Sequence, residues 1–326
     1  MFSLTRKSLY VEALDLWIDS MRSQDRCYIS HGHSDHAREH RSVVATPNTA
    51  RICRARFSRR AQERVAYEEH AYNEPWYERE HRLTLFSAGH VLGSAQLLIE
   101  GENGRFVYTG DFKLRPSRTA EPSEVKPCDV VLMECTFGDP SYVFPPHDEV
   151  AAEMIAYARG ALERGAIPVF YAYSLGKAQE AMAILGGAGL PLAVHHAIDT
   201  MAQVYSECGV TLPPYRRFDD ENVDFGSVLI WPPGGKALPA ALRGRPVRTA
   251  VLTGWSMDRG ALYRYGTQRA FALSDHADYP ALLDYVERAQ PRKVLLHHGR
   301  RDFVYRLRAL GVDAEYMEEH AQLTLF

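Results

Sequence analysis

Short apolar runs that end beside a polar or ionisable residue recur in the first 135 residues of the chain. Each run holds four to seven residues, many of them β-branched or aromatic, which is the pattern of a buried or half-buried strand. The strands predicted in this way are 8–12, 16–19, 26–30, 42–46, 81–86, 96–100, 105–109 and 128–134. Several of them deliver an acidic residue or a histidine at or just beyond their ends. We therefore expect chemistry-bearing side chains to meet at one rim of a sheet.

From about residue 140 to residue 270 the pattern changes to alternating helices and strands. A helix capped by Asp148 is predicted to run to Gly165, and Ser174 is predicted to cap a second helix. Apolar strands at 167–171, 191–194, 227–231 and 249–253 favour a parallel sheet. We expect an α/β domain at 140–270, inserted into a domain made of 1–139 and 271–326.

After residue 270 the pattern of strands that end in ionisable residues returns. A strand at 271–276 is predicted to end in His276, and a strand at 294–296 ends before His297 and His298. Helices are predicted at 278–289 and 303–310. These histidines are expected to reach the same rim as the residues of the first part.

The stretch His31-Gly32-His33-Ser34-Asp35-His36 concentrates metal-binding side chains directly after the strand predicted at 26–30. His31 and His33 can point to one side, while Asp35 and His36 turn back toward a second position. A loop of solvated polar residues is the alternative, but such a dense set is rare by chance. The loop therefore predicts a cradle for two divalent ions. Its mixture of imidazole and carboxylate suits Zn²⁺ and Mn²⁺ and leaves the choice between them open.

Three later strand ends carry residues that fit the same site. His90 lies among small residues, which let backbone and ion approach closely, and is expected to be the third ligand of the first ion. Asp111 follows a hairpin whose turn is predicted at Glu102-Asn103-Gly104, and an aspartate at that place can bridge two ions. Glu134 ends an apolar strand in an isolated carboxylate that needs a partner for its charge.

The composition of the 326 residues is that of an ordinary globular protein, with 46% hydrophobic and 24% charged residues. The five scattered cysteines fit reduced thiols better than a disulfide framework. The N-terminus has no apolar run of signal-peptide or membrane-spanning length, so we expect a cytoplasmic protein with no membrane partner. The formal net charge of −3 gives no global attraction for nucleic acid, so a polyanionic substrate would need local basic patches and the ions.

Three basic stretches have two interpretations each. The helix predicted to begin at Pro47 and its continuation are rich in arginine, which either forms a solvated face or follows a phosphate backbone. The loop with Ser174, Gly176 and Lys177 is either a helix cap or a phosphate site. The turn with Trp255 and Arg259 either is exposed or stacks a base and binds a phosphate. The arginines of the first stretch are Arg51, Arg54, Arg56, Arg59, Arg60 and Arg64.

The motifs around Glu134, Ser274 to His276, and His298-Gly299, together with the loop 31–36, resemble the β-CASP branch of the metallo-β-lactamase-fold nucleases. The resemblance covers nearly the whole chain. It implies an α/β fold, an αββα sandwich of the metallo-β-lactamase type with an inserted α/β β-CASP domain. The group that the chain resembles most is the compact bacterial enzymes associated with a DNA ligase and a helicase in repair.

The resemblance implies two divalent ions, Zn²⁺ or Mn²⁺, and a role for each site residue. His276 would donate a proton to the leaving oxygen and Glu134 would orient it. Asp35 is counted with this catalytic group as well as with the ligands. Asp19 would orient a ligand histidine, although a surface turn is nearly as good an account of it. The implied metal ligands are His31, His33 and His90 for the first ion, Asp35, His36 and His298 for the second, and Asp111 as a bridge.

The function expected on this basis is a two-metal nuclease that hydrolyses DNA, preferably single-stranded, and leaves a 5′-phosphate. DNA is favoured over RNA, with a DNA ligase and a helicase as partners in repair. An RNA-processing nuclease is the main alternative, because the metal chemistry does not read the 2′-hydroxyl. A small-molecule hydrolase on the same metal core and a scaffold with a degenerate site are further alternatives. The residues leave open whether His297 or His298 is the last ligand.

Overall fold

The computed structural model describes residues 2–5, 8–233, 238–317 and 322–323. The chain forms two compact units. Unit 1 comprises Met1–Pro116, Ala120–Ser141 and His276–Phe326, and unit 2 comprises Ser117–Thr119 and Tyr142–Asp275. The main segment of unit 2, Tyr142–Asp275, begins two residues after residue 140 and ends five residues after residue 270, which are the limits expected from the sequence.

Unit 1 contains two sheets of seven strands each within the described residues. The first has the order β20-β1-β2-β3-β4-β5-β6, with β20 at Gln322–Leu323, β1 at Phe2–Thr5, β2 at Ser8–Val11, β3 at Leu16–Ile18, β4 at Arg26–Tyr28, β5 at Ser42–Ala45 and β6 at Ala66–Glu69. The second has the order β19-β18-β11-β10-β9-β8-β7, with β19 at Ala314–Tyr316, β18 at Lys293–Gly299, β11 at Val130–Cys135, β10 at Gly104–Tyr108, β9 at Ala95–Gly101, β8 at His81–Ser87 and β7 at Trp76–Glu78.

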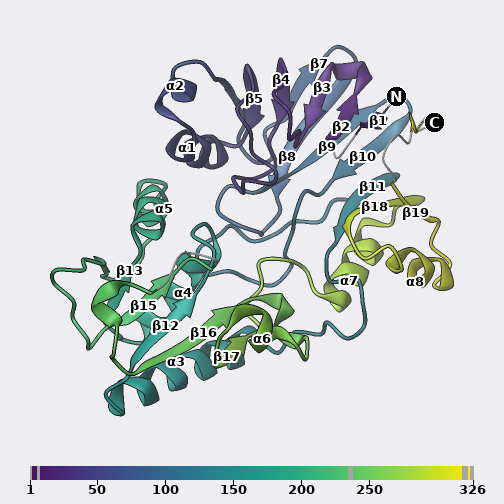
Figure 1. The fold of residues 1–326 in the computed structure, drawn as a ribbon. Helices are drawn as coiled ribbons and strands as arrows, with labels where there is room; N and C mark the ends of the chain where they lie inside the picture. The colour runs from purple at the N-terminus through teal and green to yellow at the C-terminus, as the bar shows by residue number, and fades with distance from the viewer. Residues whose placement is uncertain (1, 6–7, 234–237, 318–321, 324–326) are drawn as a thin grey trace. The chain divides into compact units, whose positions relative to one another are not determined.

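The two sheets of unit 1 pack face to face around an apolar core. Leu16 and Val44 of the first sheet share this core with Leu97 and Leu132 of the second. A second core lies between the outer face of the second sheet and two helices, α7 (Tyr279–Ala289) and α8 (Phe303–Ala309). Helix α1 (Pro47–Arg56) covers the outer face of the first sheet, with the short α2 (Arg59–Gln62) after it (Figure 1). These four layers confirm the expected αββα sandwich.

Local chemistry explains why these elements begin and turn where they do. Thr46 caps α1 by accepting a hydrogen bond from the amide of Thr49, and Pro47 takes the first helical position as predicted. The predicted hairpin is also confirmed, because Gly101 and Gly104 pair directly across its turn. Asp278 caps α7 by accepting from the amide of Ala281.

Unit 2 is built on a parallel sheet, as the sequence predicted. Its order is β14-β13-β15-β12-β16-β17, with β14 at Arg216–Arg217, β13 at Leu192–Val194, β15 at Val228–Trp231, β12 at Ile167–Tyr171, β16 at Val247–Leu252 and β17 at Arg269–Phe271. The helices α3 (His147–Glu163), α4 (Lys177–Gly187) and α5 (His196–Glu207) share one apolar core with it. Four short helices complete the described elements: the 3₁₀ helices η1 (Glu12–Leu14) in unit 1 and η2 (Ala240–Leu242) and η3 (Gly254–Met257) in unit 2, and the α-helix α6 (Ala261–Tyr265) in unit 2.

Three boundary predictions were wrong. Helix α3 begins one residue before Asp148, after Pro146, so Asp148 lies in the first turn instead of capping it. Helix α4 is capped at Gly176 and not at Ser174, because the side chain of Gln179 accepts from the amide of Gly176. Strand β17 ends at Phe271, so His276 lies in an irregular segment and not at a strand end.

Three charged side chains are buried in unit 2 and have partners there: Glu180, Lys177 and Asp275. Glu180 accepts hydrogen bonds from the hydroxyls of Ser117 and Thr119, which explains why that short segment belongs to this unit. Lys177 Nζ lies 3.2 Å from Asp275 Oδ2, and both side chains are buried.

Among the helices within the described ranges, none is long and apolar enough to cross a membrane.

We predict that Lys177→Met destabilises the protein by about 3–5 kcal/mol, because it removes the ammonium group that faces the buried carboxylate of Asp275. The double variant Lys177→Met/Asp275→Leu should recover most of this loss, since it removes both charges. Urea unfolding monitored by tryptophan fluorescence measures both. Equal losses in the single and double variants would contradict a paired charge.

Candidate metal centre

The metal-binding loop begins where β4 ends, at the rim of the first sheet of unit 1. A tight turn follows, in which the carbonyl of His33 accepts from the amides of His36 and Ala37 at 3.1 and 2.8 Å. This turn reverses the chain, so His31 and His36 both face inward and are buried. Their rings lie 4.2 Å apart, measured between centroids. The loop thus presents several imidazoles to one place, as the sequence predicted.

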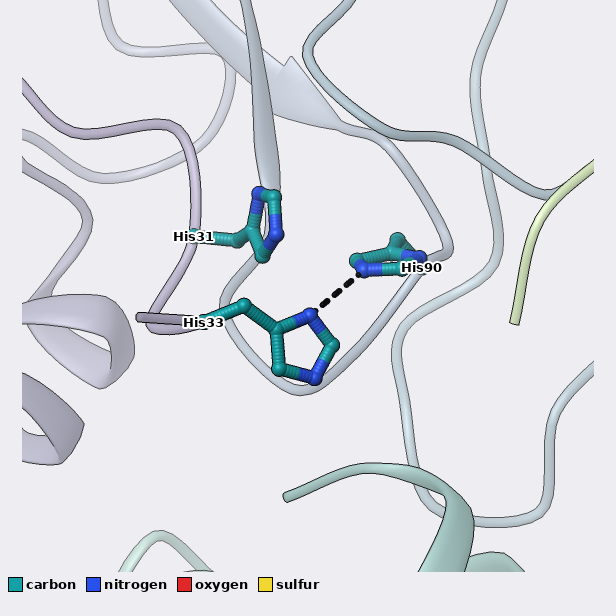
Figure 2. Close-up of side chains that lie close together, drawn as sticks. All are labelled: His31, His33 and His90. Atoms are coloured by element: carbon teal, nitrogen blue, oxygen red, sulfur yellow. Dashed lines mark hydrogen bonds between the residues drawn. The ribbon is translucent and has the colours of Figure 1, made fainter. Parts of the chain in front are cut away.

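His31, His33 and His90 form the first group of potential metal ligands (Figure 2). One nitrogen of each lies within 4.8 Å of the others. His33 Nδ1 and His90 Nε2 are 2.9 Å apart, and their rings meet edge to face. Gly89 positions His90, because its φ of +72° suits glycine and a Cβ there would collide with the carbonyl of Lys113. The structure therefore brings together the three residues expected around the first ion.

Asp111 lies at the centre of the cluster. Its Oδ2 is 3.6 Å from His31 Nε2, 3.4 Å from His36 Nε2 and 3.8 Å from His90 Nε2. His31, His36 and Asp111 form a second group of potential ligands, and His90, Asp111 and His276 form a third. One carboxylate thus belongs to two neighbouring groups, which is the position that a bridging ligand requires.

The donor set fits a metal ion on two further observations. His31 is fully buried, and its Nε2 has no hydrogen-bond partner among the described residues. A buried polar nitrogen left in this state costs roughly 1–3 kcal/mol, which a ligand would offset. Burial also lowers the pKa of His31 well below its usual range, so the imidazole is neutral, the form that binds metals.

Charge at the centre is arranged around Asp111. Burial would raise the pKa of Asp111, but His36 and His276 outweigh it and hold that pKa well below the usual range. Burial would lower the pKa of His36, but the carboxylates of Asp111 and Asp19 outweigh it and raise that pKa. Asp111 therefore stays ionised, which is the form in which a carboxylate binds metal ions.

Asp19 is buried and accepts hydrogen bonds from four groups around the site. They come from the amide and hydroxyl of Ser30, from His36 Nδ1 at 2.8 Å and from the hydroxyl of Tyr108 at 2.8 Å. The bond to Nδ1 turns His36 Nε2 toward Asp111. This geometry is the one that an orienting carboxylate requires, and it rules out the surface turn that the sequence left open.

His276 and Glu134 form a pair beside the cluster. His276 Nδ1 lies 2.9 Å from each carboxylate oxygen of Glu134 and 4.0 Å from Asp111 Oδ2. Glu134 is fully buried and accepts further bonds from the amide of Phe112 and the hydroxyl of Thr136. The carboxylate is therefore fixed from several sides, and it fixes one nitrogen of the histidine ring.

Strand β18 has a bulge at the second of its two adjacent histidines. Glu134 pairs with His297 and Cys135 pairs with Gly299, so His298 is the extra residue between them. His298 has φ 46° and its ring lies 5.2 Å from that of His36. A Cβ on Gly299 would collide with the backbone of Cys135, so the bulge needs glycine there. His297 is buried beside Tyr108 and its pKa is lowered by burial.

Several residues expected at the site do not join these groups. Asp35 is exposed and belongs to none of the clusters, so its assignment as a ligand and in the catalytic group rests on the sequence alone. His298 approaches His36 without entering a cluster. In unit 2, Lys177 is paired with Asp275, and the amide of Gly176 is occupied by Gln179, so neither presents itself to a phosphate.

The remaining substrate residues lie in unit 2 without a defined site. Ser174 is half-buried, and its carbonyl accepts from Gln179. Trp255 is half-buried and meets Tyr142 edge to face at 5.5 Å. Arg259 is exposed.

The sequence did not reveal the partners that fix the two carboxylates. Ser30 and Tyr108 bind Asp19, and Thr136 binds Glu134. The signals for them were weak: Ser30 directly precedes the metal loop, and Thr136 lies two residues after Glu134. From the sequence, Tyr108 could be recognised only as an aromatic residue of a strand. Strand periodicity does not predict which carboxylate accepts a hydrogen bond from its hydroxyl.

Two family models match the chain. A beta-lactamase superfamily domain matches residues 17–170, and a Zn-dependent metallo-hydrolase RNA specificity domain matches residues 268–321. The first match contains His31, His90, Asp111 and Glu134, and the second contains His276 and both histidines of β18. The chain belongs to the metallo-β-lactamase superfamily. The pair of domains is that of its β-CASP branch, whose members are metal-dependent hydrolases that typically bind two zinc ions.

Relatives with curated names cover different parts of the chain. A protein of Opitutus terrae named a probable DNA ligase is 40% identical over 324 residues, which are 97% of this chain and 31% of the relative. The probable RNase MJ4 of Methanocaldococcus jannaschii is 26% identical over 56% of this chain and 50% of its own length. The transcription termination factor FttA of Pyrococcus horikoshii is 35% identical over 34% of this chain and 19% of its own length. The chain thus spans half or less of each of these relatives.

We predict that Asp19→Asn lowers the affinity for zinc about 10- to 100-fold, because His36 loses the carboxylate that orients it. Titration with Zn²⁺ in competition with a chelator measures the affinity. Asp25→Asn is the control, since the Asp25 side chain is 93% exposed. If both variants bind zinc like the parent, Asp19 does not orient a ligand.

Proposed function

We propose that the chain is a metal-dependent nuclease that hydrolyses phosphodiester bonds of DNA, preferably single-stranded, and leaves a 5′-phosphate. The observation that carries this proposal is the His276–Glu134 pair, 4.0 Å from the central carboxylate of the metal-ligand cluster. A phosphodiester expels a strongly basic alkoxide, so a proton donor beside the ions speeds its hydrolysis. The pair supplies that donor.

The proposed ligands of the first ion are His31, His33 and His90, and Asp111 would bridge the two ions. The second ion is assigned to His36 and His298, with Asp35 added from the sequence. When bound, two divalent ions neutralise charge on the phosphate and lower the pKa of a coordinated water. The chain contributes the neutral imidazole of His31, an ionised Asp111 and the orienting contact from Asp19 to His36.

His276 would act through its second ring nitrogen. Because Nδ1 is held by both oxygens of Glu134, Nε2 is the atom that can give a proton to the leaving 3′-oxygen. Glu134 stabilises the protonated ring and fixes its direction. A direct role as a metal ligand is the competing account, since His276 also forms a ligand group with His90 and Asp111.

DNA is the proposed substrate because the relative matched over 97% of this chain is named a probable DNA ligase. The same name supports a DNA ligase as the functional partner, and the expected helicase has only the family resemblance behind it. RNA is the second candidate. The description of the C-terminal model as an RNA specificity domain and the name of the RNase relative favour it. Turnover of end-labelled single-stranded DNA, duplex DNA and RNA under matched metal distinguishes the two.

His33→Ala and Asp111→Asn should each abolish hydrolysis and lower the metal content, because one removes a ligand of the first ion and the other the bridge. Metal content by mass spectrometry and turnover of labelled oligonucleotides measure the two effects. His196→Ala is the control, since His196 is exposed and lies outside every ligand group within the described ranges. Full activity in Asp111→Asn would exclude the two-metal site.

His276→Ala should slow cleavage of an ordinary phosphodiester about 100- to 10,000-fold while both metals stay bound. A nitrophenyl phosphodiester hardly needs the proton, so its hydrolysis should fall much less. Glu134→Gln should show the same selectivity in milder form. Loss of metal from His276→Ala, or equal losses on both substrates, would make His276 a ligand or a structural group instead.

A further inference from the structure

A cavity of about 780 Å³ lies in unit 1 beside the metal-binding loop. It is formed by the chain that follows this loop, by the end of α1 and by α2. Gly32 and Ser34 line it, and these residues alternate along the loop with His31 and His33. The same loop therefore carries the histidines of the metal-ligand cluster and contributes to the wall of the cavity.

Arginine dominates the charge of this cavity. Glu39 is the single acidic residue in its lining, and its carboxylate accepts a hydrogen bond from Ser58. Between residues 38 and 64 the chain has eight arginines and two glutamates, although the formal net charge of the whole chain is −3. The arginines that line the cavity are Arg38, Arg41, Arg56, Arg60 and Arg64.

Most of these guanidinium groups are not neutralised by the protein. Arg38, Arg60 and Arg64 form no ion pair with a described residue, and all three are exposed. Arg41 meets Asp25 at 3.8 Å on the solvent side. Arg56 differs from them, because it donates a hydrogen bond to the carbonyl of Gly32 and so joins the cavity to the metal loop.

A concave surface lined by one sign of charge concentrates the opposite charge from solution. A solvated helix face would spread its arginines outward, whereas these come from three successive segments and share one hollow. Phe57 also lines the cavity and is half-buried, which adds an aromatic surface to the charge. Cationic grooves with aromatic side chains are typical of sites for single-stranded nucleic acid.

We propose that this arginine cavity binds the phosphate backbone of a nucleic acid strand. The part of the strand bound there is the part that extends beyond the metal centre. The proposal rests on the proposed nuclease function, since it assigns the flanking part of the same substrate. Arg38, Arg60 and Arg64 contact phosphates, and Arg56 keeps the wall of the cavity attached to the metal loop. A long strand therefore binds more tightly than a short one that reaches only the metals.

The test compares phosphorothioate-linked oligothymidylates of 20 and 4 nucleotides on the metal-loaded protein by fluorescence anisotropy. Arg60→Gln/Arg64→Gln should reduce the ratio of 20-mer to 4-mer affinity about tenfold. For the same variant, the slope of log affinity for the 20-mer against log salt concentration should become shallower by about 1.4. Each lost phosphate contact on a single strand accounts for about 0.7 of this change. The control is Arg288→Gln/Arg292→Gln, which has the same spacing on an exposed face and should leave the ratio unchanged.

An unchanged ratio in Arg60→Gln/Arg64→Gln, or an equal fall in the control, would overturn the proposal. So would a 20-residue polyglutamate that displaces the labelled strand as well as unlabelled DNA does, because the cavity would then serve an acidic polypeptide. Hydrolysis of DNA and RNA by the parent protein is measured in parallel. Turnover with an unchanged affinity ratio defeats this inference alone, whereas absence of turnover on every polynucleotide defeats the proposed function.

Discussion

The site depends on one buried carboxylate, Asp111, which is surrounded by imidazoles from two other strand ends. Asp111 follows β10 of the second sheet, and His90 follows β8 of the same sheet. His31 and His36 follow β4 of the first sheet. Burying such a carboxylate costs several kcal/mol unless cations or hydrogen bonds compensate it. The face-to-face packing of the two sheets therefore serves the chemistry, because only that packing brings both sets of loops to one place.

A second layer of carboxylates fixes the direction of the histidines. Asp19 holds His36 and Glu134 holds His276, each at a buried position with further hydrogen bonds from serine, threonine or tyrosine hydroxyls. The two carboxylates have different roles. Asp19 turns a ring nitrogen of His36 toward the cluster, whereas Glu134 occupies Nδ1 of His276 and leaves Nε2 as the proposed proton donor. The same pairing of histidine with carboxylate thus serves both proposed roles, metal binding at His36 and proton transfer at His276.

The sequence predicted the parts of the fold that follow from local pattern. Apolar runs and turn residues gave the strands of both units, and the spacing in His31 to His36 gave the core of the site. The pattern of apolar and polar residues did not predict features that depend on the geometry of the backbone. The bulge that makes His298 an extra residue in β18 arises from pairing with β11, and no periodicity shows it. Strand β17 ends at Phe271, and His276 lies in the irregular segment after it, where Glu134 holds its ring and no strand pairing does. The caps at Pro146 and Gly176 were missed because Asp148 and Ser174 are good capping residues in isolation.

Anomalous diffraction at the zinc edge, from crystals of the zinc-loaded protein, tests the central claim most directly. The account predicts two peaks on either side of Asp111. One should lie about 2.0–2.2 Å from nitrogens of His31, His33 and His90, and the other at the same distance from His36. His276 should lie outside both coordination spheres. A single peak, or two peaks with His276 as a ligand and Asp111 unbound, would contradict the account.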